Sequence, residues 1–255
     1  MQMSARNATA VTSSTGNSES GQSDRTDWTA YATSYDLLSE HNPAYRALLD
    51  DFRSFLGTIE RPGLIYDIGG GTGNYTGIAA AAFPDSRIRL IEPDPGMLAR
   101  AKSKLAAHDN VEYEGRSLET TGVTEPADLV VCVHALYTMP RQEQRLSDLR
   151  RLVRPGGLLY LVDIGRSLDL SDWRGFLFRH IVRETGLLGA IRIFWRGREI
   201  TRQNNAIRRS QDAGVFWTFD AGVLASKAEA AGFEVLRQEQ AYRGYSDLVV
   251  CRAAP

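Results

Sequence analysis

One stretch decides the fold: Leu64-Ile65-Tyr66-Asp67-Ile68-Gly69-Gly70-Gly71-Thr72-Gly73. Its first five residues are apolar except for Asp67, which predicts a buried strand that ends near this carboxylate. The glycines that follow allow a sharp turn and let a ligand approach bare backbone. From Asn74 an alanine-rich run predicts a helix that Pro84 ends. Strand, glycine turn and helix N-terminus together form a pocket of unpaired N–H groups that is typical of sites for nucleotide-like ligands.

The spacing of the glycines narrows the class of ligand. Nicotinamide- and flavin-binding loops need Gly-x-Gly-x-x-Gly or Ala, and neither glycine register here provides it. A P-loop needs Gly-Lys-Ser or Gly-Lys-Thr, which the sequence lacks. The pattern present, Asp67-x-Gly69-x-Gly71-x-Gly73, resembles motif I of the class I S-adenosylmethionine-dependent methyltransferases. The resemblance covers about residues 60–163 and 218–252.

Composition and length indicate one globular unit. The chain has 255 residues, of which 43% are hydrophobic, so residues 27–255 can form a single domain with a substantial core. Residues 1–26 are rich in Ser, Thr, Asn, Gly and Gln, which predicts a disordered tail rather than a secretory signal. The net charge of −1 gives no global footprint for nucleic acid or a membrane, and no apolar run approaches the roughly 20 residues of a transmembrane helix. Two cysteines in apolar strand patterns, Cys132 and Cys251, favour a reduced, cytoplasmic protein. We expect it to be a monomer or a homodimer.

The elements after the glycine loop predict an α/β fold with a doubly wound sheet. Strand patterns recur at residues 87–92, 111–115, 128–133 and 158–163, with helical patterns between them. A helix over 220–231 then precedes two strands, 233–238 and 245–251, whose short link at 243–244 predicts an antiparallel hairpin. The expected fold is therefore a Rossmann-like sheet of seven strands, mostly parallel and closed by this hairpin. The resemblance implies the same arrangement.

The resemblance also implies which residues hold S-adenosylmethionine. Glu92 ends the second strand, where a carboxylate can accept hydrogen bonds from both ribose hydroxyls. Met97 follows it and is expected to contact the adenine, although a methionine there also serves as core filling. Where the family usually carries an acid, this chain has Arg116, so Ser117 and the backbone of Leu118 are expected to take the adenine edge. The remaining cofactor ligands implied by the resemblance are the residues that match motif I: Asp67, Gly69, Gly71 and Gly73.

A helical segment precedes the core. Aromatic and apolar residues recur at helical spacing over residues 27–57, with a break at His41-Asn42-Pro43. This segment is expected either to brace the sheet or to act as a lid, with Tyr31 and Tyr35 closing over the cofactor. Both readings can hold together.

A second helical segment, residues 164–217, follows the fifth strand and should overhang the ligand crevice. It carries ten arginines against five acidic residues, and several aromatic residues. One reading is a solvated cap whose arginines pair with acids elsewhere. The other is a substrate cap over an aromatic or anionic acceptor, with Arg192 and Arg196 binding a carboxylate or phosphate and Tyr137 also contacting the acceptor.

The expected reaction is methyl transfer from S-adenosylmethionine to an oxygen, nitrogen or carbon atom of a small organic acceptor. His134 follows the fourth strand and is expected to contact the cofactor or act as a base, and His180 is the alternative base. The Asn/Asp-Pro-Pro-Tyr/Phe motif of amino-methylating DNA and RNA enzymes is missing, and Asp163 alone provides no magnesium ligand cluster, so no metal is expected. Two alternatives remain: a non-methylating reaction such as a cyclisation in the same pocket, and a non-catalytic cofactor-binding module.

Overall fold

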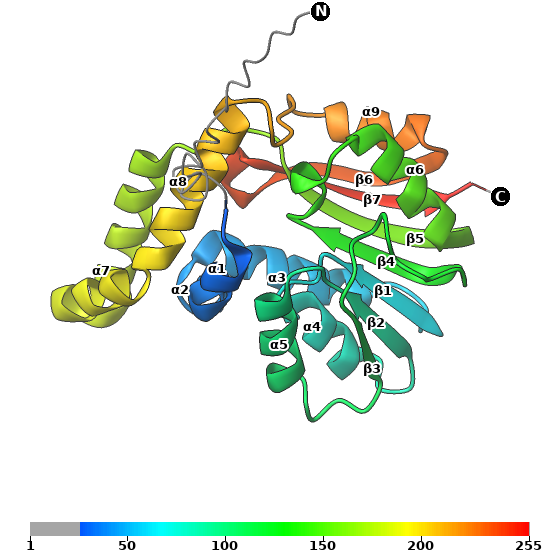
Figure 1. Cartoon of the computed structure of the whole chain (residues 1–255), viewed down its shortest axis with the longest axis horizontal. Coiled ribbons are helices and arrows are strands. Elements are labelled where there is room, and N and C mark those ends of the chain that lie inside the picture. Colours follow the sequence, from blue (N-terminus) through cyan, green and yellow to red (C-terminus); the bar gives the residue numbers. More distant parts are fainter. Residues whose placement is uncertain (1–25, 255) are drawn as a thin grey trace, which may run out of the picture.

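A seven-stranded sheet lies at the centre of the computed structural model, which describes residues 26–254 (Figure 1). The strand order is β3-β2-β1-β4-β5-β7-β6. The strands are β1 (Leu64–Ile68), β2 (Arg87–Ile91), β3 (Val111–Glu114), β4 (Ala127–Val133), β5 (Val153–Ile164), β6 (Phe233–Ala241) and β7 (Ser246–Ala253). β1 to β5 pair in parallel, whereas β7 runs antiparallel to both β5 and β6. The predicted mostly parallel sheet with its C-terminal hairpin is confirmed. The predicted tail lies outside the described residues except for Thr26.

Helices cover both faces of the sheet, as a doubly wound fold requires. One face packs against α3 (Pro43–Leu56), α4 (Asn74–Ala82) and α5 (Pro95–Lys104). The other packs against α6 (Gln142–Leu152) and α9 (Val223–Ala230). The carboxyl ends of β1, β2, β4 and β5 therefore open at one edge between the two helical layers, where ligands of such sheets bind.

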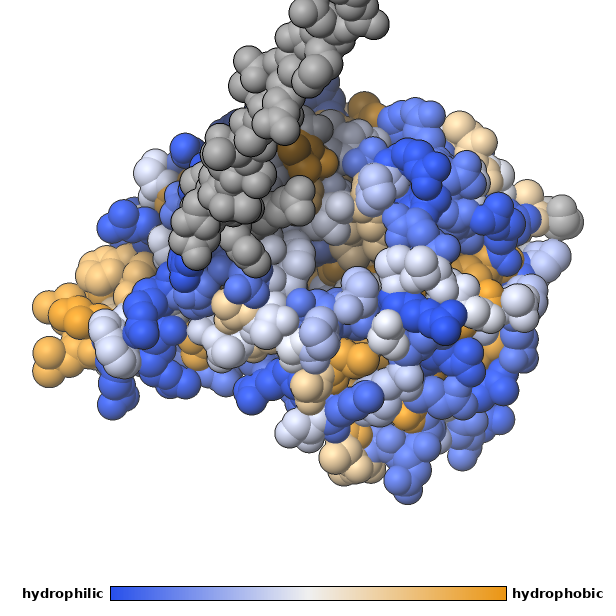
Figure 2. Space-filling view, in the orientation of Figure 1, coloured by the Kyte–Doolittle hydropathy of each residue, from blue (hydrophilic) through white to orange (hydrophobic). Residues whose placement is uncertain are grey.

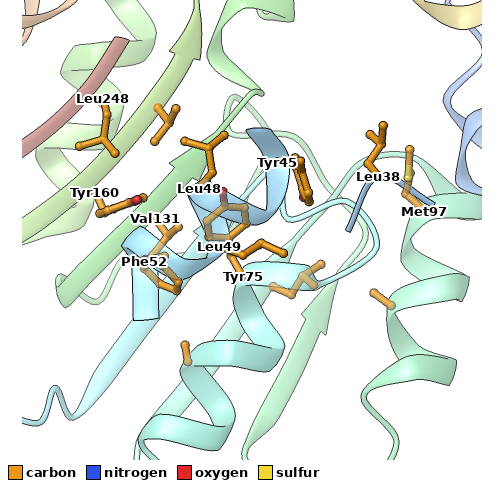
Figure 3. Packing of buried hydrophobic residues seen from close by; sticks show 14 of the residues in the cluster. Leu38, Tyr45, Leu48, Leu49, Phe52, Tyr75, Met97, Val131, Tyr160 and Leu248 are labelled. Carbon is orange, nitrogen blue, oxygen red and sulfur yellow. The ribbon is translucent and has the colours of Figure 1, made fainter. Parts of the chain in front are cut away.

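The core on the α3 side is built from interlocking aromatic rings (Figure 3). The ring of Phe52 on α3 lies 4.9 Å from that of Tyr160 on β5 and 5.1 Å from that of Tyr75 on α4, measured between centroids. Phe52 and Tyr160 are fully buried. Edge-to-face packing of this kind ties α3 and α4 to the sheet below the ligand edge.

Additional helices gather at the ligand edge. The N-terminal segment forms α1 (Trp28–Tyr35) and α2 (Leu37–His41), and α1 packs against α5 and α8. The inserted segment forms α7 (Leu170–Arg196), which Gly186 interrupts with φ 74° and ψ 172°, and α8 (Arg198–Asp212). α7 and α8 project from one end of the molecule (Figure 1). Within residues 26–254, no helix has both the length and the apolar character needed to cross a membrane.

The fifth strand and the last helix begin at other residues than the sequence pattern predicts. The fifth strand was expected to begin at residue 158, but β5 begins at Val153, which pairs with Ala127 across a register shift. The last helix begins at Val223 rather than Asp220, because Gly222 adopts a left-handed conformation with φ 87° and starts the helix there. In both cases backbone pairing and glycine conformation override the local residue pattern.

Candidate active site

The glycine loop between β1 and α4 forms one wall of a cavity. Gly69, Gly71 and Gly73 all have positive φ, at 66°, 55° and 78°. A Cβ atom on Gly69 would lie 2.5 Å from the Cβ of Ala135, whereas one on Gly71 would meet no atom within 4 Å. Gly69 and Gly71 line the cavity, while Gly73 packs against Leu105 and caps α4. The loop thus presents bare backbone where the sequence predicts it, with Gly73 as a support behind it.

Glu92, directly after β2, faces the same cavity. Its Oε2 accepts a hydrogen bond from the Gly71 N–H at 3.0 Å, and its Oε1 accepts one from the Asp94 N–H at 2.8 Å. Only 7% of the residue is exposed. Burial raises the pKa of Glu92 to about 7, although the two N–H donors partly oppose the shift. Each carboxylate oxygen keeps a further lone pair with which it can accept a hydrogen bond from a ligand.

Asp67 lies beneath the loop rather than in the cavity. Its Oδ2 accepts a 2.6 Å hydrogen bond from the hydroxyl of Thr76 in the first turns of α4. Burial raises the pKa of Asp67 to about 6, because the Thr76 hydrogen bonds offset only part of the desolvation. Asp67 does not line the cavity, so its geometry fits a role in holding the loop on α4 and not the predicted direct contact with the cofactor.

The rest of this cavity, the loop cavity, is a slot with apolar walls and a polar rim. Ile91, Met97, Leu118 and Met139 provide apolar surface. Ser117, predicted to contact the adenine, lines the slot together with Arg116, and its backbone N–H donates to the Thr120 hydroxyl at 3.2 Å. The predicted residues Met97, Ser117 and Leu118 are therefore brought together with Glu92 and the glycine loop.

A second cavity, the aromatic cavity, lies beside the first under the added helices. Its lining contains seven aromatic rings, seven aliphatic side chains and three polar residues: Trp28, Tyr31, Tyr35, Tyr45, Tyr137, Trp173 and Tyr242; Leu38, Ile164, Leu168, Leu170, Leu177, Ile200 and Ile207; Asn42, His134 and Asn204. None of these is an acid, lysine or arginine. Tyr31 donates to Asn204 Oδ1 at 3.0 Å, and Asn42 Nδ2 donates to the Tyr242 hydroxyl at 3.2 Å. The indole nitrogen of Trp173 is buried with no hydrogen-bond partner among the described residues.

Three residues, Trp28, Tyr35 and His134, line both cavities and mark their junction. His134 has φ 51°, and its N–H donates to the Val162 carbonyl at 2.8 Å. Its Nε2 lies 2.9 Å from the Ser246 hydroxyl, and its ring lies against Tyr242 at 4.9 Å. Burial lowers the pKa of His134 to about 3, so the imidazole is neutral at physiological pH. This position supports the predicted contact with the cofactor, but a histidine that resists protonation is a weak proton acceptor.

The structure places the predicted tyrosines at different points of the site. Tyr35 lines both cavities, whereas Tyr31, predicted to close over the cofactor, lines only the aromatic cavity. Tyr137, a predicted acceptor contact, lines the aromatic cavity and is 2% exposed. All three tyrosines therefore line the aromatic cavity, and Tyr35 alone among them also reaches the loop cavity.

Three predicted residues lie away from both cavities. Arg192 and Arg196 are exposed on the second part of α7, and neither lines the loop cavity or the aromatic cavity. His180, the alternative base, has its Nε2 2.8 Å from Arg46 Nη2 and 3.1 Å from Glu184 Oε1, on the side of α7 that faces α3. The helical arrangement of the insertion, which residue composition does not fix, turns these side chains outward. Their predicted roles in catalysis and acceptor binding lose their geometric basis.

Two residues of the site, Trp28 and Tyr242, were not predicted as site residues from the sequence. They reach the aromatic cavity from α1 and from the link between β6 and β7, and Asn204 lines the same cavity from α8. The aromatic character of residues 164–217 was a signal for Trp173, but no motif marks Tyr242. Among the described residues, no group of three or more His, Cys, Asp or Glu side chains is arranged to hold a metal ion.

Part of this chain is similar in sequence to known methyltransferases. A family model described as a methyltransferase domain matches residues 66–159. Trans-aconitate 2-methyltransferase of Methylobacterium nodulans is 32% identical over 98 residues, which are 38% of this chain and 37% of the relative. Malonyl-[acyl-carrier protein] O-methyltransferase of Methylococcus capsulatus is 28% identical over 107 residues, 42% of this chain and 39% of the relative. The matches thus span well under two thirds of the length of these curated relatives.

A solved structure shares the fold over most of the chain. The N-methyltransferase NodS from Bradyrhizobium japonicum WM9, in complex with S-adenosyl-L-homocysteine, superposes with a TM-score of 0.62 at 13% identity. The alignment covers 90% of this chain and 100% of NodS. Mitomycin 7-O-methyltransferase MmcR aligns with a TM-score of 0.53 at 19% identity, over 87% of this chain and 61% of MmcR. At such low identities the similarity establishes the fold, which is that of class I methyltransferases.

Proposed function

Because this chain belongs to the class I S-adenosylmethionine-dependent methyltransferases, we propose that it transfers a methyl group from S-adenosylmethionine to a small, uncharged and largely apolar acceptor. One observation carries the proposal: the loop cavity and the aromatic cavity meet at Trp28, Tyr35 and His134. A cofactor in the first cavity and an acceptor in the second would bring their reacting atoms together at this junction.

The loop cavity fits the two ends of the cofactor. The Glu92 carboxylate would accept hydrogen bonds from the ribose hydroxyls, and Met97 and Leu118 would enclose the adenine. The bare backbone of Gly71, whose missing Cβ would point into open space, would leave room for the amino acid part, whereas Gly69 has to be glycine because a Cβ there would collide with Ala135. Polar groups thus sit at the rim of an apolar slot, as in small-molecule sites generally.

The aromatic cavity indicates the class of acceptor. No lysine or arginine lines this cavity, so an acceptor's carboxylate or phosphate would be buried there without a cationic side chain to pair with. Burying an unpaired charge costs too much free energy for such an acceptor to be favoured. An aromatic ring or branched hydrocarbon would instead gain apolar and edge-to-face contacts. The buried, unpaired N–H of Trp173 favours an acceptor with at least one oxygen atom. The expectation of an anionic acceptor is therefore replaced by that of an uncharged one.

The residues of the junction would align the reactants and exclude water. When bound, the cofactor supplies an electrophilic methyl group on a positively charged sulfur. Trp28 and Tyr35 of α1 would close the junction against solvent. They would also hold the acceptor in line with the methyl group, and this alignment is the main source of rate enhancement in a single displacement. Neutral His134, hydrogen-bonded to Ser246, would orient a polar group of the acceptor. Because its pKa is low, it would not accept the proton that the acceptor loses.

The test is formation of S-adenosylhomocysteine, measured by mass spectrometry, with the full chain, S-adenosylmethionine and two sets of acceptors. One set contains uncharged phenols and apolar alcohols, and the other contains trans-aconitate and similar polyanions. Turnover is expected only with members of the first set, and Trp173→Phe should raise the acceptor KM while leaving cofactor affinity unchanged. Preferential methylation of polyanions would refute the proposed acceptor class. Binding of the cofactor with turnover to another product would favour a non-methylating reaction.

A further inference from the structure

The end of the molecule formed by α7 exposes an apolar group. After the break at Gly186, four large side chains are exposed: Leu187 (57%), Leu188 (84%), Ile191 (55%) and Trp195 (66%). We call these four residues the α7 tip. Figure 2 shows hydrophobic surface at this projecting end of the molecule. Isolated exposed apolar residues are ordinary, but four on one projecting helix form a patch that marks an interaction surface.

Cationic side chains without partners flank the α7 tip. Arg183, Arg192 and Arg196 are exposed, and none of them forms an ion pair or a hydrogen bond through its side chain with another described residue. The guanidinium of Arg198 lies over the Trp195 ring at 4.7 Å from its centroid. Glu184, beside Arg183, pairs with Arg46 at 2.9 Å. Glu199, three residues after Arg196, pairs with Arg202 at 3.9 Å and accepts a hydrogen bond from Gln203 at 2.6 Å, so neither acid is paired with these arginines. Apolar residues, a tryptophan and unpaired arginines on one helix are the composition of a segment that binds an anionic membrane surface.

An apolar pocket adjoins the aromatic cavity. It lies between α2 and the α7–α8 pair and is lined by Leu37, Leu38, His41, Asn42, Leu177, Ile181, Ile193, Phe194, Gly197, Ile200 and Thr201. Leu38, Asn42, Leu177 and Ile200 also line the aromatic cavity. Its lining includes Ile193 and Phe194, which directly precede Trp195 in the sequence, so this pocket and the α7 tip are built on the same second part of α7.

We propose that the α7 tip docks on an anionic lipid surface. Leu188, Ile191 and Trp195 enter the boundary between headgroups and acyl chains, and Arg183, Arg192 and Arg196 contact lipid phosphates. The docked protein would hold the adjoining apolar pocket near the bilayer, from which an apolar acceptor could reach the aromatic cavity, a consequence that rests on the proposed function. The overall charge of −1 gives no sign of this surface, because the excess of positive charge is confined to the inserted helices and is balanced by acidic residues elsewhere in the chain.

Flotation of the full chain with vesicles tests the apolar part of the surface. Wild-type protein is expected to float with vesicles of equal parts phosphatidylglycerol and phosphatidylcholine. Leu188→Ser/Ile191→Ser should reduce the apparent affinity by about tenfold or more, because two exposed anchors are lost. The control Leu236→Ser, which changes a leucine 42% exposed on β6, should float like wild type. Failure of the wild-type chain to float, or equal loss in the control, would overturn the proposal.

A second comparison tests the charged part. Each arginine is expected to contribute about fivefold to binding, so Arg183→Gln/Arg192→Gln should weaken flotation by about 25-fold. Arg61→Gln/Arg141→Gln removes the same charge from exposed positions elsewhere and should leave binding unchanged. Equal binding to pure phosphatidylcholine vesicles would overturn the requirement for an anionic surface.

Two further outcomes would assign the surface to a different occupant. A stable dimer in light scattering that Leu188→Ser/Ile191→Ser dissociates, without vesicle binding, would make the α7 tip an interface between copies. Binding to a soluble acidic protein without vesicle binding would likewise refute docking on lipid. Vesicles contain no S-adenosylmethionine, so a failure of the proposed methyl transfer would leave this result intact.

Discussion

At the scale of single residues, Glu92 connects the glycine loop to the predicted ligand. Its position after the second strand was predictable, because parallel strands end at one edge and the acid closes the β2 pattern. Its raised pKa was not predictable, because the burial that causes it depends on how residues from other elements, such as Leu118 after β3, pack around the cavity. The carboxylate is thus both the predicted ribose ligand and a group that titrates close to neutral pH.

The first prediction is a pH-dependent affinity for S-adenosylmethionine. Ribose hydroxyls donate to the ionised form of Glu92, whose pKa of about 7 lies above its usual value, so affinity should fall as the pH is lowered through 7. The Kd should increase toward tenfold per pH unit below this value. Calorimetry between pH 6.0 and 7.5 measures the slope. Glu92→Gln should bind more weakly and with a flatter profile, and an unchanged slope in this variant would contradict the assignment.

A second prediction concerns Asp163, which lies at the end of β5 and is fully buried. Neither carboxyl oxygen has a well-formed hydrogen bond among the described residues. Burial raises the pKa of Asp163 well above its usual range, and the backbone N–H groups of Tyr137 and Ile164 oppose this shift only in part. The folded protein therefore retains a proton that the unfolded chain releases, so stability contributed by this group falls as the pH rises, by at most about 1.4 kcal/mol per pH unit. Asp163→Asn should raise Tm more at pH 8 than at pH 5.

Thermal unfolding followed by circular dichroism at both pH values measures this difference. Asp220→Asn, at an exposed position just before α9, is the matched control and should change Tm little at either pH. An Asp163→Asn variant that is less stable than wild type at pH 8 would show that the carboxylate is ionised and needed.

At the scale of elements, the N-terminal helices cover the junction, and the carboxylate of Asp36 is one of the groups that attach them. Asp36, between α1 and α2, accepts hydrogen bonds from the Thr72 hydroxyl at 2.8 Å, Arg100 Nε at 2.9 Å and Lys104 Nζ at 2.8 Å. Burial alone would raise the pKa of Asp36, but these partners outweigh it and lower the pKa. The periodicity of the sequence predicted the helices. It could not predict these three hydrogen bonds to Asp36, which join α1 to the glycine loop and to α5.

The third prediction follows from this attachment. Asp36→Asn removes the charge from a side chain only 14% exposed and should destabilise the protein by about 1–3 kcal/mol. Since Trp28 and Tyr35 lie on the helix that Asp36 fixes, the variant should also release S-adenosylmethionine faster, as stopped-flow displacement would show. Glu40→Gln, on the exposed side of α2, is the control. Identical release rates in wild type and Asp36→Asn would mean that α1 does not act as a lid.

At the scale of the whole molecule, the fold followed from the sequence more closely than the site did. Apolar strand patterns, short links and the order of motifs were enough to predict the sheet and its hairpin, because they depend on local periodicity. The acceptor site depends on how α1, α7 and α8 converge, and Tyr31, Asn204 and Tyr242 meet only in three dimensions. Residue composition left open whether the arginines of the insertion bind an aromatic or anionic acceptor or form a solvated cap. The helices turn Arg192 and Arg196 to the surface, and no charged side chain lines the aromatic cavity.

The most direct test of this account is a calorimetric titration of the full chain with S-adenosylmethionine at pH 8. We predict saturable binding of one cofactor per chain, weakened at least about tenfold in Glu92→Ala, since a charge-assisted hydrogen bond to the ribose is lost. Glu234→Ala, an exposed acid on β6, should bind like wild type. Absence of saturable binding by the folded wild-type protein, or equal affinity in Glu92→Ala, would contradict the central claim that the loop cavity holds this cofactor.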